Sequence, residues 1–589
     1  MLRVWQVLCS LCLLLKLSQC DQPTNSSTFL SASSSSNSST NSSTNPQILD
    51  VAIRTQRDVS RPIPIDQLTV AGLSLNSLFE VGGYTQESLG NLSSLLYNGT
   101  QAIMVDLYWN EFTSVWQLCP APFPQNMTYN MNSNVNVTWE NRTYSCEYGF
   151  TTDNVMDALA SYIQSTNTDF QANFMHLLYN LKSIHYEKSN RTTELENIYL
   201  PRSKTVVVGN SSLIDTVAPI SSYLFTPDVL NSFRARGSAN YSSYQNFYSR
   251  SNFTMPSLET ILLSEYKRLL VNIVSDDTVQ SRRSYEISDQ DRRILFFEDT
   301  LPIDAMNTTT ADNYCNQVFS YRNTVEDFDN QTLSTHFRYA IDNDNEPFTT
   351  QSLRRYVRCG LSPIFNSTSY QVPATNQSIS QNKEIVKDYI PQLFWSWAPG
   401  QPLVAENSTA NRSSSGNVAY KCVYMTPDGW EIGNCYTEHQ IACKNLTAPN
   451  DWYIPIHERR TYFDVDRNDC PPGFNFSLPR SSIEMLALHN AIQQQGATFP
   501  VWIDLNDITV ETCFVSGGPY AECPYQRTVT TTKFVKMIAP SSIVALVILI
   551  LIFLEKTLRK DHLQANRKKY WKKKISEHYS KHEYEGVPS

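Results

Sequence analysis

An uncharged apolar segment near the carboxyl end constrains this 589-residue chain more than any other feature. Residues 537–554 read MIAPSSIVALVILILIFL and contain no charged side chain. As a helix rising 1.5 Å per residue, the segment spans about 27 Å, close to the roughly 30 Å hydrocarbon thickness of a bilayer. It is therefore predicted to be a transmembrane helix, which assigns the rest of the chain to two opposite sides of a membrane.

The charges beside this helix predict its orientation. Residues 555–589 carry ten Lys or Arg and five Asp or Glu, and ten minus five gives +5. Because the whole chain has a net charge of −9, the residues before 555 carry −14. The positive-inside rule places the basic flank in the cytosol. Residues 528–536 then form a juxtamembrane segment, and residues 555–589 form a basic cytoplasmic tail.

The first twenty residues, MLRVWQVLCSLCLLLKLSQC, have the pattern of a secretory signal peptide. Arg3 precedes an apolar stretch, and Ser18 and Cys20 occupy the small-residue positions that signal peptidase reads. The apolar core, about ten residues long, is too short to cross the bilayer. Residues 1–20 are thus expected to be removed. The mature chain is predicted to be a single-pass type I membrane protein with a luminal or extracellular N-terminus.

Glycosylation sequons agree with this orientation. All N-x-[ST] triplets precede the apolar segment, although a chain rich in Asn and Ser also produces such triplets by chance. The predicted glycosylation sites are Asn25, Asn37, Asn41, Asn91, Asn98, Asn126, Asn136, Asn141, Asn190, Asn210, Asn240, Asn252, Asn307, Asn330, Asn366, Asn376, Asn407, Asn411, Asn445 and Asn475. The chain is expected to be a membrane glycoprotein of the endoplasmic reticulum, the vacuole or the cell surface.

The cysteines predict disulfide bonds rather than a metal site. Three of the thirteen fall in the signal peptide. The remaining ten are Cys119, Cys146, Cys315, Cys359, Cys422, Cys435, Cys443, Cys470, Cys513 and Cys523. In an oxidising lumen this even number predicts up to five disulfides, whose connectivity the sequence leaves open. Spacing favours the pairs 119–146, 315–359 and 513–523, and no C-x-x-C or close His/Cys cluster indicates a metal.

The rest of the chain before the membrane divides by composition. Residues 21–46 contain too few apolar residues to offset chain entropy, so they are predicted to be a disordered glycosylated leader. Residues 47–405 are predicted to form a folded domain. Residues 406–417, ENSTANRSSSGN, have the composition of a linker, and residues 418–527 are predicted to form a second, Cys-rich domain.

Helical and strand patterns alternate in residues 47–405. Leucines at 89, 92, 95 and 96 predict a helix that ends at an Asn-Gly turn, and a buried strand follows. Further strands are predicted over 205–209 and 293–299, and a helix over 258–274, where apolar residues recur every three or four positions. This alternation favours an α/β or α+β architecture.

The Cys-rich region has the order of elements of a C-type-lectin-like domain. A cysteine precedes a predicted amphipathic helix containing Ile483, Leu486 and Ala491, a W-I-x-L strand follows, and two cysteines close the region. It lacks the Glu-Pro-Asn and Gln-Pro-Asp triplets that chelate calcium together with sugar hydroxyls. Glycan binding is therefore an alternative function with little support from the residues.

Asp106 and Glu111 form the strongest candidate for a catalytic site. A buried strand that ends in an acid resembles an early strand of phosphatidylinositol-specific phospholipase C-like barrels, in which such acids bind a metal or orient a histidine. No histidine precedes Asp106, and the first one after it, His176, follows seventy residues later. We therefore expect an inactive barrel in which Asp106 and Glu111 cap a turn or pair with Arg54 or Arg57. A phosphodiesterase is the alternative.

Two further clusters give no cofactor site. An EF-hand loop begun at Asp342 or Asp464 lacks the Gly at its sixth position and the Glu at its twelfth, so no metal or cofactor is predicted.

The tail segment NRKKYWKKK (566–574) begins about twelve residues from the membrane. Attraction to anionic lipid, about 1 kcal/mol per basic residue, explains it without nucleic acid. YEGV (584–587) fits a tyrosine-based sorting signal.

Several motifs together resemble the fungal maintenance of telomere capping protein 6 family. They are TQRDVSRPIPIDQLTVAGLSLNSLFE, VDLYWNE with WQLCPAP, CPPGFNFSLPR, VWIDLND and CPY. The resemblance implies a non-enzymatic, glycosylated, single-pass membrane protein linked genetically to telomere capping, and it supplies no catalytic residues. Since the folded part is expected in the lumen, the link would be indirect and without nucleic-acid contact. The expected partners are the membrane and N-glycans, and protein partners are unknown.

Overall fold

The computed structural model describes most of the chain between residue 46 and residue 582. The described ranges are 46–185, 192–202, 206–237, 241–249, 253–276, 285–320, 324–372, 375–377, 389–402, 419–525 and 531–582. Several predicted features lie outside them: the signal peptide, the leader up to residue 45, the linker, the YEGV motif, and the sequons at Asn25, Asn37, Asn41, Asn190, Asn240, Asn252, Asn407 and Asn411. Asn376 lies in a described strand, but its side chain is not described.

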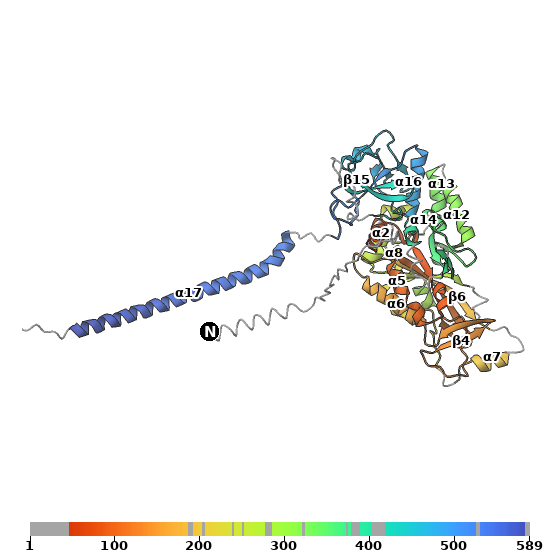
Figure 1. The fold of residues 1–589 in the computed structure, drawn as a ribbon, viewed down its shortest axis with the longest axis horizontal. Helices are drawn as coiled ribbons and strands as arrows, with labels where there is room; N and C mark the ends of the chain where they lie inside the picture. Colours follow the sequence, from red (N-terminus) through yellow and green to blue (C-terminus); the bar gives the residue numbers. More distant parts are fainter. Residues whose placement is uncertain are drawn as a thin grey trace, which may run out of the picture. The chain divides into compact units, whose positions relative to one another are not determined.

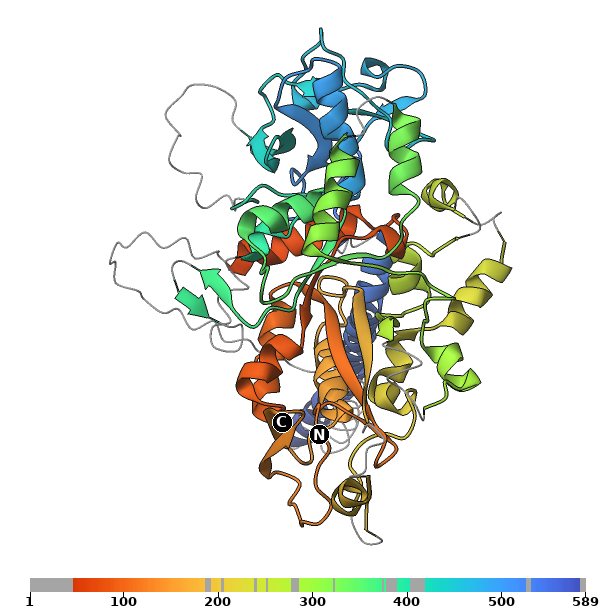
Figure 2. The ribbon, with the colours of Figure 1, turned by 90° about the vertical axis from the view of Figure 1, so that its right-hand side faces the viewer.

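A curved parallel sheet forms the centre of the first region (Figures 1 and 2). In spatial order its strands are β7 (Leu224–Phe225), β8 (Leu269–Asp276), β6 (Met175–Ile184), β2 (Thr100–Asn110), β1 (Ala71–Ser74), β11 (Ser362–Phe365), β10 (Arg338–Ile341) and β9 (Asp304–Asn307). β3 (Val115–Gln117) pairs antiparallel with the end of β2. Because β1 pairs with both β2 and β11, the first and last strands of this sheet in chain order are neighbours.

The sheet curves around a core of its own. One hydrophobic cluster contains Met104 of β2 and Leu270 of β8 together with Tyr339 of β10 and Ile364 of β11. Strands β8 and β10 lie toward opposite ends of the sheet order, and their side chains can share one cluster only if the sheet bends into a barrel. Phe296 adds a single parallel bridge to Asn272 of β8. The described strands therefore form a partial barrel with a filled interior.

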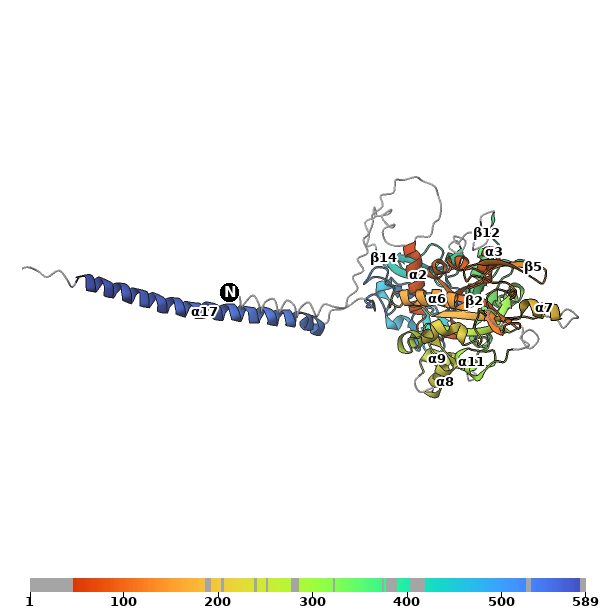
Figure 3. The same ribbon diagram turned by 90° about the horizontal axis from the view of Figure 1, so that it is seen from below.

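Helices pack around the sheet, and several begin at polar caps. The Thr226 hydroxyl accepts a hydrogen bond from the Val229 N–H at the start of α8, and α11 lies beside α8 (Figure 3), with 3.9 Å between Arg293 Nε and Asp228 Oδ2. The helices are α2 (Pro46–Val59), η1 (Ile65–Gln67), α3 (Asn76–Gly82), α4 (Gln86–Leu89), α5 (Leu92–Tyr97), α6 (Thr152–Ser165), α7 (Thr192–Tyr199), η2 (Asp215–Tyr223), α8 (Pro227–Ala235), α9 (Ser243–Tyr248), η5 (Thr260–Ser264), α11 (Asp289–Ile294), α12 (Thr308–Ser320), α13 (Val325–Thr332), α14 (Thr350–Arg358) and η6 (Ile390–Gln392).

Two short hairpins complete the first region. They are β4 (Asn134–Trp139) with β5 (Arg142–Glu147), and β12 (Tyr370–Val372) with β13 (Thr375–Gln377). The β4–β5 hairpin is an insertion between β3 and α6, and it belongs to the end of the barrel described below.

The structure corrects three of the predicted elements. The helix predicted over 258–274 is wrong beyond residue 264, because Leu269–Asp276 is strand β8. A strand buried on both faces is a continuous apolar run, which periodicity alone cannot distinguish from a buried helix. Residues 206–209 form no strand, and within 293–299 the only strand contact is the bridge at Phe296. The helix predicted before the Asn-Gly turn is present as α4 and α5, and β2 follows as predicted.

The Cys-rich region contains two small sheets and one long helix. The sheets are β15 (Gly429–Asn434), β14 (Tyr420–Thr426), β20 (Val501–Asn506) and β16 (Gln440–Ile441), and β18 (Trp452–Tyr453), β17 (Cys443–Asn445) and β19 (Phe474–Phe476). The helices are α16 (Ser482–Gln494), η8 (Tyr462–Asp464) and η9 (Arg467–Asp469). The predicted helix and W-I-x-L strand are present. The C-type-lectin-like fold itself stays a prediction.

The Cys-rich region packs on the first region through direct hydrogen bonds. Ser60 at the end of α2 donates to the Arg480 carbonyl at 2.8 Å, and Arg480 donates to the Val59 carbonyl at 3.1 Å. Before β1, the Thr69 and Ser482 hydroxyls lie 2.7 Å apart. These contacts lie at the amino ends of the barrel strands, as Figure 2 shows with the Cys-rich region in blue.

Helix α17 (Thr531–His582) contains the apolar segment. Residues Ala539–Leu558 are long and apolar enough to cross a membrane, and none of this window is buried against other parts of the protein. The helix continues through the basic residues that follow. The predicted span 537–554 lies entirely within α17.

Candidate functional site

Asp106 lies in the carboxyl half of β2, two residues beyond the level at which the neighbouring parallel strand β1 ends. It is paired in register with Asn180 of β6, and the Asn180 amide donates to Asp106 Oδ1 at 2.8 Å. Lys182, two residues further along β6, forms an ion pair with Asp106 Oδ2. The Asn76 amide, two residues beyond β1, donates to the same oxygen. Strand β6 and the start of α3 therefore direct three polar side chains to one carboxylate.

The β4–β5 hairpin extends over this end of the barrel. The Tyr84 N–H donates to the Ser145 carbonyl at 2.8 Å, and the Glu147 N–H donates to the Tyr84 carbonyl at 3.0 Å. The Cys119–Cys146 disulfide ties the hairpin to the chain leaving β3. The Asp106 side chain is only 1% exposed, whereas Lys182 is 32% exposed. The barrel mouth therefore buries the acid and leaves its cation partly open to solvent.

The surroundings of Asp106 hold its neighbouring hydroxyls neutral. Burial, together with the negative charge of Asp106, raises the pKa of both Tyr84 and Tyr108 far above the ordinary value. Burial and the nearby Asp344 carboxylate raise the pKa of Glu80. Lys182 Nζ also lies 5.6 Å from the centre of the Tyr108 ring, within the range of a cation–π contact. Lys182 thus contacts both side chains: it forms an ion pair with Asp106 and a cation–π contact with the Tyr108 ring.

The predicted pairing of the acids with Arg54 or Arg57 is wrong. Both arginines belong to α2, which precedes β1 and lies at the amino ends of the strands. Arg54 donates to the Thr512 carbonyl at 2.8 Å, and Arg57 pairs with Asp58 at 2.9 Å. Glu111 lies in the turn after β2, where its N–H donates to the Ile184 carbonyl at 3.1 Å, and its buried Oε1 has no hydrogen-bond partner among the described residues.

Two buried histidines lie at the other end of the barrel. His176 on β6 is paired in register with Ala102, four residues before Asp106, or roughly 13 Å along the strand. Its Nδ1 lies 2.6 Å from the Tyr339 hydroxyl, and complete burial lowers its pKa to about 3. His336 Nδ1 lies 2.6 Å from Asp66 Oδ2 beneath the Phe253 ring. Neither imidazole reaches the mouth.

The histidine–carboxylate pair formed by His336 and Asp66 escaped the sequence analysis because 270 residues separate its members. An imidazole bonded to a carboxylate is a common acid–base arrangement, but here both side chains are buried at the amino ends of the strands. In barrels of this type, residues at that end serve stability rather than catalysis. The pair is therefore assigned to the core.

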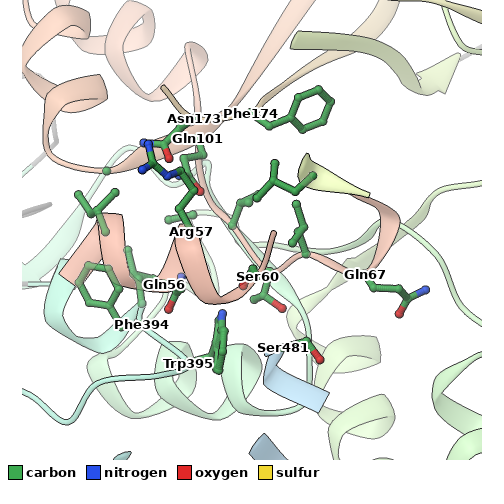
Figure 4. Close-up of a pocket in the computed structure, with 18 of the residues that line it drawn as sticks. Gln56, Arg57, Ser60, Gln67, Gln101, Asn173, Phe174, Phe394, Trp395 and Ser481 are labelled. Atoms are coloured by element: carbon green, nitrogen blue, oxygen red, sulfur yellow. The ribbon is translucent and has the colours of Figure 1, made fainter. Parts of the chain in front are cut away.

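A small cavity lies beside this end of the barrel (Figure 4). It holds about 60 Å³, and Arg57, Gln101, Asn173, Trp395 and Ser481 are among its lining residues. A single ordered water needs roughly 10–15 Å³ of such volume, so the cavity fits a few water molecules and no larger ligand.

At the mouth, the charge of Asp106 is compensated by an ion pair with Lys182. The hydrogen-bond and ion-pair partners of Asp106 are two amides and one ammonium group, and no described histidine is among them. General acid–base catalysis needs a titrating group that reaches the reacting atoms. Within the described ranges, no group of three or more His, Cys, Asp and Glu side chains could hold a metal ion.

The cysteines form five bridges in the structure. The predicted pairs Cys119–Cys146, Cys315–Cys359 and Cys513–Cys523 are present. The two pairs that the sequence left open are Cys422–Cys435 and Cys443–Cys470.

Among the described sequons, those with exposed Asn residues are Asn126, Asn136, Asn141, Asn307, Asn330 and Asn475, and those with half-buried Asn residues are Asn91, Asn98, Asn210, Asn366 and Asn445.

Fold and site together define a partial (β/α) barrel protein with a closed mouth, a disulfide-rich second region and one helix apolar enough for a membrane. The family model described as the MTC6 partial TIM-barrel domain matches residues 42–386. The chain belongs to the maintenance of telomere capping protein 6 family.

Relatives with that name match along almost their whole length. A protein from Lodderomyces elongisporus is 59% identical, over 92% of this chain and 91% of the relative. One from Candida albicans is 49% identical over 96% of this chain and 99% of the relative, and one from Komagataella phaffii is 27% identical over 89% and 93%. Among solved structures, a mutant of phosphatidylinositol-specific phospholipase C from Staphylococcus aureus is 7% identical over 57% of this chain and 97% of that chain. Its TM-score of 0.25 is too low to carry any argument about mechanism.

Proposed function

We propose that this protein is a non-enzymatic, single-pass type I membrane glycoprotein whose barrel is a binding or structural scaffold. The observation that carries this proposal is the state of Asp106. Its carboxylate is 1% exposed and is neutralised by Lys182, so it has neither access to a substrate nor a partner for proton transfer. The negative charge of Asp106 is therefore used in an internal ion pair with Lys182 and is not available to a substrate.

Four observations support the membrane topology. The 20-residue apolar window in α17 is long enough to span a bilayer, and a run of basic residues follows it. Five disulfides favour an oxidising compartment for the folded part. All sequons precede the helix. Together they favour a folded region in the lumen or outside the cell and a cytosolic tail of residues 555–589.

The family name refers to telomere capping, and the proposed topology makes that link indirect. With this orientation the barrel and the Cys-rich region face away from the nucleus, and only the short tail faces the cytosol. An effect on telomeres would then pass through trafficking, the state of the cell surface or vacuole, or stress signalling. Direct nucleic-acid binding is not part of the proposal.

Two measurements test it. Full-length protein purified in detergent, incubated with phosphatidylinositol in mixed micelles, should release no inositol phosphate above the level of an Asp106→Asn variant with the same melting temperature. Release that the variant loses would establish the alternative, a phosphodiesterase. In sealed microsomes, protease should remove a C-terminal tag while the remainder stays protected and shifts on endoglycosidase treatment. Protection of the tag would contradict the topology.

A further inference from the structure

A groove runs between α14 and α16, where the barrel meets the Cys-rich region. The two helices lie side by side (Figure 1), and the turn between β14 and β15 closes one end. The groove holds about 420 Å³, within the roughly 300–1,000 Å³ typical of pockets that bind small molecules. It is distinct from the barrel mouth, which lies at the opposite ends of the strands.

One wall of the groove is strongly basic. Arg354, Arg355 and Arg358 of α14 all line it, whereas Asp428 is the only Asp or Glu among the described lining residues. Arg355 pairs with Asp312 of α12 at 3.2 Å, so the basic character of this wall rests on Arg354 and Arg358. Arg354 and Arg358 are four residues apart on one helix, a spacing at which like charges repel. Asp428 offsets part of this repulsion through its ion pair with Arg354, and a bound anion would offset more of it.

The opposite wall, formed by α16, is mixed: Met485 and Leu486 are apolar, whereas Ser482, His489, Asn490 and Gln493 are polar. Met425, Met485 and Leu486 are buried lining residues, and the Trp395 ring lies among them. Methionine and tryptophan side chains present adaptable or flat apolar surface, which suits a hydrocarbon group better than a polar one. The groove thus combines a cationic side and a hydrophobic patch within one volume.

Hydrogen bonds to the β14–β15 turn hold Arg354 and Arg358 in place but do not use all of their N–H donors. Arg354 donates to the Asp428 carbonyl and, at 3.2 Å, to Asp428 Oδ1. Arg358 donates to the Pro427 carbonyl. Each guanidinium has five N–H donors, so both keep donors that a ligand could use. Burial and the neighbouring Arg354 lower the pKa of Arg358, while Asp428 raises it.

We propose that the groove between α14 and α16 binds a small anionic amphiphile. A carboxylate or phosphate group contacts Arg354 and Arg358, and the hydrocarbon part lies on Trp395, Met425 and Met485. Fatty acids and phosphate-bearing lipids share this chemistry. The site is independent of the function proposed above, because it uses no residue of the barrel mouth.

Hydrogen exchange of the full-length protein in zwitterionic nanodiscs tests this inference, because it reports the site of binding even when the probe also enters the lipid. The probes are decanoate, decyl phosphate, the neutral decanol and inorganic phosphate. Peptides covering α14 and α16 should be protected by decanoate, by decyl phosphate or by both, and not by decanol or inorganic phosphate at equal concentration. Preference for one anion identifies the fatty-acid or the phosphate class. No protection by either anion, or equal protection by decanol, overturns the proposal.

Variants test the role of charge. Arg354→Gln combined with Arg358→Gln should raise the half-saturating concentration at least tenfold, whereas Arg236→Gln, which removes an exposed arginine elsewhere, should leave it unchanged. Asp428→Asn removes the competing carboxylate and should lower the half-saturating concentration severalfold. This gain of affinity cannot arise from misfolding, so it decides the question even if the double variant is unstable. An unchanged affinity in Asp428→Asn overturns the charge-based assignment.

Discussion

Lys182 of β6 and Asp106 of β2 form an ion pair across two adjacent parallel strands at the barrel mouth. The two residues are not directly opposite: Asp106 is in register with Asn180, and Lys182 is in register with Tyr108. The lysine side chain therefore extends back along the strands toward the acid. An otherwise uncompensated charge in the barrel is neutralised in this way.

Replacing Lys182 with methionine should destabilise the protein. Removing one partner of a buried ion pair leaves the other charge buried and typically costs 3–5 kcal/mol. Because Lys182 is about a third exposed, we expect a loss of about 2–3 kcal/mol in the free energy of unfolding. Chemical denaturation of the full-length protein in detergent measures it.

A double variant provides the control. Lys182→Met combined with Asp106→Asn leaves no buried charge, so it should be more stable than Lys182→Met alone. Arg236→Gln removes an exposed pair with Glu265 and should change stability by less than about 1 kcal/mol. If Lys182→Met is no worse than Arg236→Gln, the ion pair has no stabilising role.

His176 should make the stability depend on pH. Burial lowers its folded pKa to about 3, whereas in an unfolded chain it titrates near 6.5. Between these values the unfolded state binds one more proton, so stability falls as the pH falls. From pH 6.5 to pH 5 this residue should cost about 2 kcal/mol at 1.36 kcal/mol per unit.

The comparison with His176→Gln isolates this effect. Asp342 and Asp507 act in the opposite direction, because burial raises the pKa of each to about 6, but they are present in both proteins and cancel in the difference. The stability difference between wild type and His176→Gln should therefore shrink as the pH falls from 7 to 5. A constant difference would show that folding leaves the pKa of His176 unchanged.

Cys119→Ser should cause retention in the endoplasmic reticulum. The Cys119–Cys146 bridge closes a loop with a sequence separation of 27 and ties the hairpin over the mouth. In the loop-entropy model, losing it costs about 3–4 kcal/mol. Glu111→Gln removes a charge whose buried oxygen has no hydrogen-bond partner among the described residues, so export should stay nearly normal. Microscopy of the tagged full-length protein against a reticulum marker measures both, and equal retention of the two variants would contradict this.

Glycan occupancy should follow the hydrogen bonding of the sequon amides. N-glycans attach to the amide nitrogen, and exposed Asn136 and Asn475 have room for them. The Asn445 amide donates to Asp451 at 2.8 Å and the Asn366 amide to the Asp342 carbonyl at 3.3 Å, so a glycan at either would disrupt the fold. Enzymatic deglycosylation in heavy-oxygen water with peptide mass spectrometry should label the first two positions and not the last two. Absence of any label would contradict the luminal orientation.

The sequence by itself determined the features that depend on nearby residues. The apolar helix, the helix before the Asn-Gly turn, strand β2 and three disulfides between neighbouring cysteines were all predicted correctly. Each rests on composition, periodicity or spacing within a few tens of residues, where chain connectivity keeps the interacting groups close.

Only the tertiary structure decided which partner each buried polar group meets. Asp106 pairs with a lysine 76 residues away, and His336 with an acid 270 residues away, because the register of parallel strands brings them together. The same burial made β8 a strand although its apolar run also fits a helix. Hydrophobic burial identifies the residues that go inside, but it is non-directional. The neighbours of a charge inside the barrel are therefore fixed by strand order and register, which no local pattern records.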